Sequence, residues 1–119
     1  MSAICLCLKL ALIGWSGASV ADNVTTYQVM AHYRPDAFET NPFLRPLQDR
    51  PVALSATMAA TDLLGGWALY RFAGKTHPKM AALGFVGLGF MRGYFAAHNM
   101  HTMGTVDQLR AHPVFIRSF

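Results

Sequence analysis

The sequence has few charged residues: only 13% are Asp, Glu, Lys or Arg, while 53% are hydrophobic. Soluble domains are about a quarter charged, so this chain is poor in charge for a water-exposed surface. Its formal net charge of +4 reflects a shortage of acids, with ten Lys and Arg against six Asp and Glu. No basic stripe of the kind that binds nucleic acid is present. The balance favours anionic membrane lipid as a partner and excludes nucleic acid.

Cysteine is nearly absent as well, and both examples, Cys5 and Cys7, lie in the first hydrophobic run. A C-x-C pair is poorly placed to form a disulfide bond in either a strand or a helix, so we interpret these as buried apolar thiols. No serine lies in a nucleophile motif, and no glycine-rich loop suited to phosphate occurs. The sequence therefore predicts no cofactor and no metal site, and it identifies no catalytic residue.

Three long hydrophobic runs are present instead, each long enough for a helix to cross a bilayer. We expect an all-α integral membrane protein with three transmembrane helices in an antiparallel bundle, and a polar connection between the first and the second. The expected spans are about 4–28, 51–72 and 79–101, with a C-terminal tail at 102–119, all within a single membrane domain, 1–119.

The first run has two interpretations. Residues 19–21 read Ser-Val-Ala, which fits cleavage of a signal peptide after Ala21. The positions before Lys9 are apolar, however, where a signal peptide carries its positive charge. Small residues also recur every four positions, and such rows let helices approach closely in lipid. These are Gly14, Ala18, Asp22 and Thr26. We therefore favour a retained span.

The third run repeats this spacing of small residues. Gly89, Gly93 and Ala97 follow one another at four-residue intervals. Glycine and alanine at such intervals are typical of close helix contacts in membranes. We predict that these three residues pack against another helix.

Two opposite charges lie inside the second and third runs. Asp62 is near the middle of one and Arg92 is inside the other. A lone charge at the bilayer centre costs roughly 2.5–3.5 kcal/mol on insertion scales, so such residues face the bundle and pair. We predict an intramembrane ion pair between Asp62 and Arg92, with Asp22 as an alternative partner for the arginine. A proton or ion path through Asp62 and Arg92 is the competing interpretation.

Other polar residues fall where the alternating helices deliver them to one side of the membrane. Asn41 and Pro42 suit the start of a short helix, as N-cap and first helical residue. We predict a polar cluster at this face, made by Asp22 and Thr26 after the first span, Glu39, Asn41 and Pro42 in the connection, and His98 and Asn99 after the third span.

The ordered set of Asp22 to Thr26, Glu39-Thr40-Asn41-Pro42 and His98-Asn99 resembles a group of small bacterial membrane proteins classed as a domain of unknown function. The resemblance covers about residues 10–100. It implies a three-helix membrane fold and no particular activity.

The leading hypothesis is a structural or accessory membrane subunit whose polar cluster fastens helices or docks a partner, either another membrane protein or a second copy of the chain. The alternatives are an intramembrane metal-dependent or acid-base enzyme, using Asp22, Glu39, His98 and His101, and a small transporter through Asp62 and Arg92. Residues 71–79 carry Arg71, Lys75 and Lys79 without an acid. The positive-inside rule places that turn in the cytoplasm, for a multi-pass protein of the bacterial inner membrane.

Overall fold

The computed structural model describes residues 2–112, which form long helices and contain no strand. The elements in order are α1 (Ala3–His32), the 3-10 helix η1 (Arg45–Leu47), α2 (Pro51–Ala73) and α3 (Pro78–Ala111). Helices α1, α2 and α3 are each long and apolar enough to cross a membrane, by length and composition. The all-α fold with three such helices agrees with the sequence prediction.

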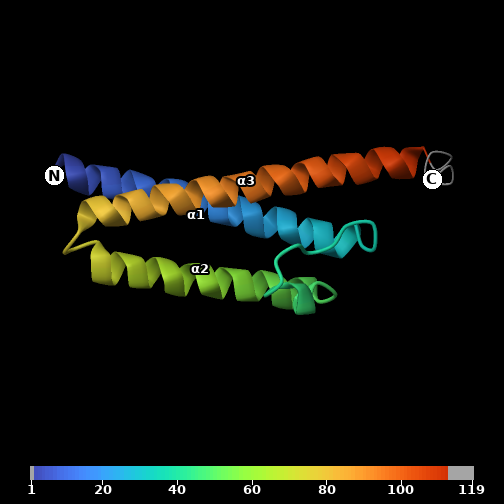
Figure 1. Cartoon of the computed structure of the whole chain (residues 1–119), viewed down its shortest axis with the longest axis horizontal. Helices are drawn as coiled ribbons and strands as arrows, with labels where there is room; N and C mark the ends of the chain where they lie inside the picture. Colours follow the sequence, from blue (N-terminus) through green and yellow to red (C-terminus); the bar gives the residue numbers. More distant parts are fainter. Residues whose placement is uncertain (1, 113–119) are drawn as a thin grey trace.

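The three helices lie side by side along the long axis of the molecule (Figure 1). Helices α1 and α3 run in the same direction and α2 runs antiparallel to both, so the N-terminus and the short α2–α3 turn share one end (Figure 1). The connection between α1 and α2 lies at the opposite end, toward the C-terminus. Helix α1 packs chiefly on α3, whereas α2 makes fewer contacts with either of them.

Local sequence explains where the helices begin. The Ser2 hydroxyl accepts a hydrogen bond of 3.2 Å from the backbone N–H of Cys5 and so caps α1. Proline opens both α2 and α3, at Pro51 and Pro78, where its missing N–H costs no helical hydrogen bond. Helix α3 gives way at His112, which precedes a proline and is therefore biased away from helical geometry.

The bounds of α2 agree closely with the expected span, but the other two helices are longer than expected. Helix α1 continues to His32, beyond the expected end near 28. Helix α3 continues to Ala111, so the first part of the expected tail is helical and holds no separate turn. The remainder of that tail, 113–119, lies outside the described residues.

The contact between α1 and α3 repeats every seven residues. Along α1 the buried positions include Leu8, Trp15, Asp22 and Val29. Along α3 the buried or half-buried positions include Phe85, Arg92, Asn99 and Val106. A seven-residue repeat keeps one seam of each helix facing its neighbour, as in a parallel coiled coil. The polar residues of interest therefore occupy core positions of this seam.

Two apolar cores lie along α1, one on each side of the polar part of the seam. One lies toward the α2–α3 turn and consists of Leu8, Ala11, Trp15, Ala81 and Phe85. The other lies toward the connection and consists of Val29, Met30, Ala37, Leu54 and Met58. In the first core the rings of Trp15 and Phe85 lie 5.3 Å apart. Between the two cores the seam is polar, and this polar layer holds the candidate site.

Of the three residues expected to pack through small side chains, Gly89 lies at the helix contact. A Cβ atom on Gly89 would lie 3.4 Å from the Trp15 Cα, whereas one on Gly93 would meet nothing within 4 Å. Ala97 is exposed, and its neighbour Ala96 is buried instead. The reason is geometric: a step of four residues turns about 40° past one full turn, so a row of fours leaves the seam.

Candidate functional site

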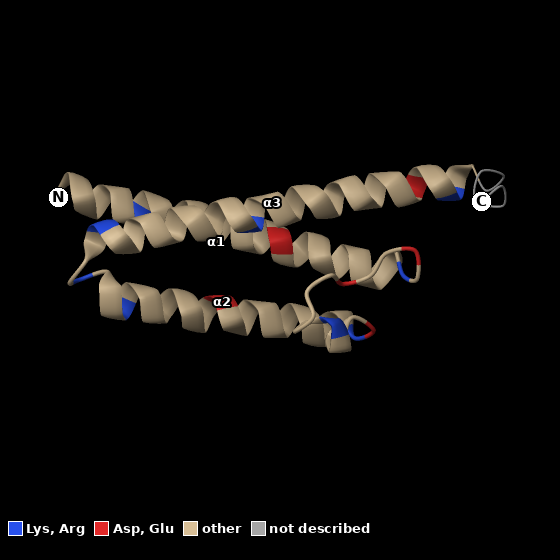
Figure 2. Ribbon diagram, viewed as in Figure 1, with Lys and Arg blue, Asp and Glu red and all other residues tan. Residues whose placement is uncertain are grey.

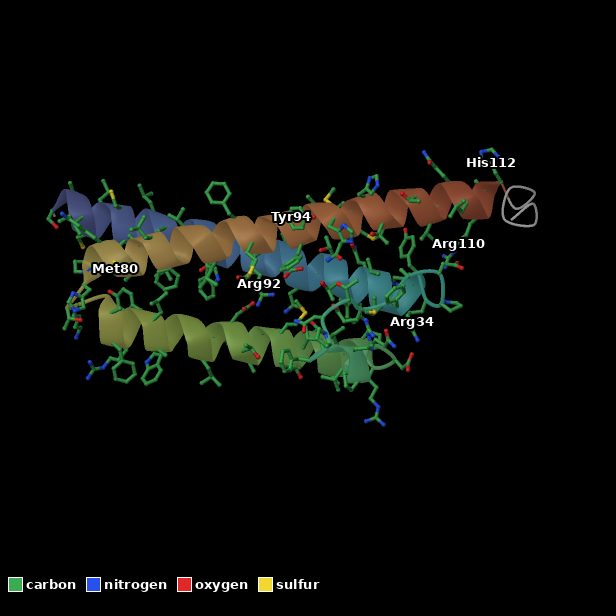
Figure 3. All side chains as sticks on the ribbon, in the orientation of Figure 1. Arg34, Met80, Arg92, Tyr94, Arg110 and His112 are labelled. Atoms are coloured by element: carbon green, nitrogen blue, oxygen red, sulfur yellow. The ribbon has the colours of Figure 1, made fainter. Side chains whose placement is uncertain are left out.

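Arg92 is the centre of the polar layer, because it bonds to carboxylates on both other helices. Its Nη1 lies 2.8 Å from Asp22 Oδ2 on α1, and its Nη2 donates to Asp62 Oδ1 on α2. Figure 3 shows Arg92 reaching from α3 toward α2. The side chains of Arg92, Asp22 and Asp62 are only 17%, 4% and 14% exposed. Both partners expected for Arg92 are therefore engaged at once.

The contact with two carboxylates on different helices suits the arginine side chain. The guanidinium presents several donors in one plane, so it can bind two carboxylates where a lysine would act as a single point charge. Asp62 lies at the midpoint of α2, which is the depth at which an unpaired charge is most costly in a bilayer. Two carboxylates face one guanidinium, so the trio carries one negative charge in excess. In the ribbon coloured by charge, the remaining charged residues lie mostly toward the two ends (Figure 2).

Asn99 extends the polar layer by binding α1 next to this ion-paired trio. Its side-chain amide nitrogen lies 3.0 Å from the hydroxyl oxygens of Thr25 and Thr26, and 3.5 Å from Asp22 Oδ1. The Thr26 hydroxyl in turn donates to Asp22 Oδ1 at 3.2 Å. Asp22 therefore has both carboxylate oxygens occupied by side chains of its own helix and of α3.

A second polar contact, which the sequence did not single out, joins α1 to α2. The Asn23 amide donates to the Ser55 carbonyl at 3.2 Å, and the Ser55 hydroxyl donates to Asn23 Oδ1 at 2.7 Å. Asn23 lies within the Asp22 to Thr26 stretch, but neither it nor Ser55 belongs to a charge pair, and nothing in the sequence pointed to a contact between the two.

The Glu-x-Asn-Pro segment folds into a turn held by its own polar groups. Glu39 Oε1 accepts the backbone N–H of Asn41 at 2.9 Å, and Asn41 Oδ1 accepts the N–H of Phe43 at 3.0 Å. The Asn41 carbonyl then accepts the N–H of Arg45 at 2.9 Å, leading into η1. Asn41 thus caps the turn at 42–44, whereas the short helix expected to begin at Pro42 begins instead at Arg45, with Leu44 as its N-cap, and Pro42 lies exposed ahead of it.

This turn borders a cavity of about 300 Å³ that reaches the polar layer. The polar lining consists of Asp22, Thr26, Glu39, Thr40, Asn41, Arg92, His98 and Asn99, and the apolar lining of Leu44, Met58 and Phe95. The cavity therefore brings together all the residues of the expected polar cluster except Pro42. His101 does not line it and is exposed on α3.

His98 lines the cavity and is exposed. Its ring stacks on Tyr94, with the ring centres 6.4 Å apart and the planes 14° from parallel. Within residues 2–112, no three His, Cys, Asp or Glu side chains lie close enough together to hold a metal ion. The set of Asp22, Glu39, His98 and His101 is thus not assembled as a ligand shell.

Beyond the cavity, the ends of α1 and α3 are fastened by polar contacts at the surface. The Tyr33 hydroxyl donates to Asp107 at 3.0 Å, and Arg110 donates to Asp36 at 2.9 Å and to the His32 carbonyl at 3.0 Å. The hydrogen bond to the Asp107 carboxylate, together with some burial, raises the pKa of the Tyr33 phenol. Figure 3 shows Arg110 on this part of α3. These contacts were not expected because residues 102–111 were not predicted to be helical.

A larger groove of about 750 Å³ follows α1 and α3 on the side of the other apolar core. Its lining includes Leu10, Trp15, Phe85 and Phe90, together with Gly14, Gly89 and Gly93. No Asp, Glu, Lys, Arg or His side chain lines it, and the polar groups of its lining residues include the Cys7 thiol and the Tyr94 phenol.

Comparisons with known proteins give no further identification. No family model, no curated protein and no solved structure matches this chain. The resemblance based on Glu39-Thr40-Asn41-Pro42 and His98-Asn99 therefore stays a prediction, and the function rests on the geometry of the site.

Proposed function

We propose that this chain is a structural or accessory subunit of the bacterial inner membrane, with its polar layer fastening three transmembrane helices into one unit. The observation that carries the proposal is that Arg92 on α3 binds Asp22 on α1 and Asp62 on α2 at the same time. Helix α2 makes fewer contacts with α1 and α3 than those two helices make with each other, so this layer and the Asn23–Ser55 contact add specific attachment to the apolar packing of Leu54 and Met58.

The hydrogen bonds within the polar layer support a structural role for these residues over a catalytic one. The carboxylate oxygens of Asp22 and the amide nitrogen of Asn99 are hydrogen-bonded to other side chains of the same layer. A general acid or base must be free to exchange a proton with a substrate, whereas these groups are bound to one another. The metal-dependent enzyme and the transporter remain alternatives, and neither has an observation of comparable weight in its favour.

The charges at the two ends support a sidedness for the subunit. Arg71 at the end of α2, Lys75 in the α2–α3 turn and Lys79 at the start of α3 lie at the same end, and the positive-inside rule therefore places that end in the cytoplasm. The connection, with Glu39 and the cavity, then faces the opposite side of the membrane, where it is available to another membrane protein or a second copy of the chain.

Purification of the full-length protein from native membranes in a mild detergent tests this proposal. The intact mass, the mass of the assembly and the metal content are measured on the same sample. An accessory subunit is expected to keep a partner in fixed ratio. Arg92→Leu should lower that ratio, whereas Arg71→Leu, a matched change at an exposed arginine on α2, should not.

A chain that migrates alone at its own mass, with no partner and no second copy, contradicts the proposal. Bound metal in fixed ratio under those conditions favours the metal-dependent enzyme instead. A mature chain that begins at Asp22 would remove most of α1 and the fold described above with it.

A further inference from the structure

Two titratable side chains of the cavity are not used to hold the helices together. Glu39 is half-buried and takes part in no ion pair among the described residues, and its carboxylate accepts a 2.9 Å hydrogen bond from the Asn41 N–H. His98 makes a ring contact with Tyr94 and no side-chain hydrogen bond within that part of the chain. Both groups face the cavity, so their polar atoms are available to a ligand.

The charge around the cavity is negative. Asp22, Glu39 and Arg92 line it, and Arg92 is shared with a further carboxylate, that of Asp62. Three carboxylates thus stand against one guanidinium, which leaves two negative charges in excess when His98 is neutral. The Arg92 charge is matched within the polar layer. The Glu39 carboxylate forms no ion pair among the described residues, and the guanidinium of neighbouring Arg45 donates instead to the Glu39 backbone carbonyl at 3.1 Å. Opposite charge is strongly attracted to such a site where the surroundings exclude water.

The volume and the lining of the cavity indicate which class of cation fits into it. Its volume of about 300 Å³ equals roughly ten water molecules, enough for a small organic ion. Leu44, Met58 and Phe95 form an apolar wall beside the polar groups, which suits a carbon chain. No metal-ligand set was found among residues 2–112, whereas an ammonium group has three donors for carboxylate, hydroxyl and imidazole acceptors.

We propose that this cavity binds a primary ammonium group, with the Glu39 carboxylate as its counter-ion and the apolar wall in contact with the attached carbon chain. Thr40 and His98 supply further acceptors at the rim. The proposal is independent of the accessory role, because it uses the polar groups that the fastening of the helices leaves over. The ammonium belongs either to a free amine or to the headgroup of an amine-bearing lipid.

Calorimetric titration of the full-length protein with n-propylammonium, in a non-ionic detergent at neutral pH, tests the proposal. We expect saturable binding at one site per chain. Tetramethylammonium, which has the charge but no N–H donor, and 1-butanol, which has no charge, should both bind far more weakly. Absence of saturable propylammonium binding would overturn the proposal, as would equal binding of the three probes.

Glu39→Gln is the decisive variant, because glutamine keeps an oxygen acceptor for the Asn41 N–H while removing the charge. We expect it to weaken propylammonium binding about tenfold or more, as the loss of a charge-assisted hydrogen bond requires. Asp49→Asn is the matched control. It changes the net charge by the same amount on the same side of the protein, where Asp49 pairs with Arg34 at 2.6 Å outside the cavity, and it should leave binding unchanged.

A second variant tests the same site in case Glu39→Gln disturbs the turn that Glu39 and Asn41 form. Leu44→Lys introduces an ammonium group of the chain itself into the cavity lining and should abolish propylammonium binding while the helical signal is retained. Unchanged affinity in either folded variant would contradict the assignment of the site.

The source of the ammonium is separated by repeating the titration in lipid nanodiscs. If a lipid headgroup occupies the cavity, propylammonium must compete with it, so its apparent affinity falls in phosphatidylethanolamine relative to phosphatidylcholine. If a free amine is the ligand, the two lipids give the same affinity. Failure to bind in both lipids and in detergent would refute the ammonium site and would leave the accessory role to be judged by its own assay.

Discussion

At the scale of single residues, Arg92 accounts for the positions of Asp22 and Asp62, the carboxylates that lie inside α1 and α2. A buried guanidinium or carboxylate without a partner costs several kcal/mol, and a buried pair is stable only when its geometry and hydrogen bonds are good. Here one arginine has two carboxylate partners, and Asp22 is further bonded to Thr26 and Asn99. Of the three ion-paired side chains, that of Asp22 is the least exposed, and it also has the most side-chain hydrogen-bond partners.

A second contact at this scale, between Tyr33 and Asp107, makes a prediction about pH. The carboxylate raises the pKa of the Tyr33 phenol above its ordinary value of about 10. A raised folded-state pKa means that this contact contributes stability below about pH 10 and loses it as the pH rises through the folded value. We expect Asp107→Asn to move the Tyr33 titration back toward its ordinary pKa.

The measurement is tyrosinate absorbance against pH, with Tyr33→Phe subtracted to isolate this phenol from the other three tyrosines. Asp49→Asn, at an exposed acid elsewhere on the same end of the molecule, serves as the control and should leave the curve in place. A Tyr33 titration that is identical with and without the Asp107 carboxylate would show that the contact does not form in solution.

At the scale of elements, Gly66 makes the clearest prediction about helix packing. A Cβ atom on this buried glycine of α2 would lie 2.5 Å from the Trp15 indole of α1. We expect Gly66→Ala to lower the free energy of unfolding by about 1–3 kcal/mol, the usual cost of overpacking a core. Gly65→Ala should be neutral or stabilising by up to about 1 kcal/mol, since alanine favours the helix and a Cβ there meets nothing within 4 Å.

Both variants are compared with the original chain by reversible unfolding in mixed detergent micelles. The two glycines are adjacent and lie on the same helix, so the difference between them isolates the contact with Trp15. Equal effects of the two substitutions would argue that α2 does not pack against α1 at this level.

The elements also show what the sequence reveals and what it does not. The bounds of α2 were predictable because Pro51 and Gly74 mark its ends, and the pairing of Asp62 with Arg92 followed from the cost of charge inside a hydrophobic run. The extension of α3 was not predictable, because hydropathy falls where a helix leaves a membrane, whereas the helix itself can continue. Its polar end is held by the end of α1 and the connection, through the contacts of Arg110 with the His32 carbonyl and with Asp36.

The seam between α1 and α3 was missed for a related reason. Rows of small residues at four-residue intervals predicted which helix faces would be in contact. Two long parallel helices stay in contact, however, only through positions that repeat about every 3.5 residues. Asp22, Arg92 and Asn99 occupy positions of this seven-residue repeat. The repeat of hydrophobic and polar residues every seven positions would therefore have predicted that they lie in the core. The cavity could not be predicted, because it depends on how residues 33–50 fold back over the helices.

At the scale of the whole molecule, helix length sets the relation to the bilayer. At about 1.5 Å per residue, α2 is just long enough to cross a hydrocarbon core of about 30 Å. Helices α1 and α3, with 30 and 34 residues, exceed it. Since their polar extensions lie at the same end, they project together on the side of the connection, where the cavity also lies.

This arrangement predicts that Phe43 and Lys75 lie on opposite sides of the membrane. In a chain with Cys5→Ser and Cys7→Ser, an impermeant maleimide added to sealed, oriented vesicles should label Phe43→Cys and Lys75→Cys from opposite sides. Phe43 is 90% exposed and Lys75 is also exposed, so both sites are accessible to the reagent. Labelling of both cysteines from the same side would contradict a single crossing by α2.

The proposed fastening of the three helices depends on the pairing of Arg92 with Asp22 and Asp62. The most direct test is the unfolding free energy of Arg92→Leu, compared with that of the triple variant Arg92→Leu, Asp22→Asn and Asp62→Asn. Arg92→Leu alone orphans two buried carboxylates and should cost about 3–5 kcal/mol. The triple variant leaves no buried charge and is predicted to recover most of that loss. If the triple variant is no more stable than Arg92→Leu alone, the carboxylates are not the partners that Arg92 stabilises, and the proposed fastening is wrong.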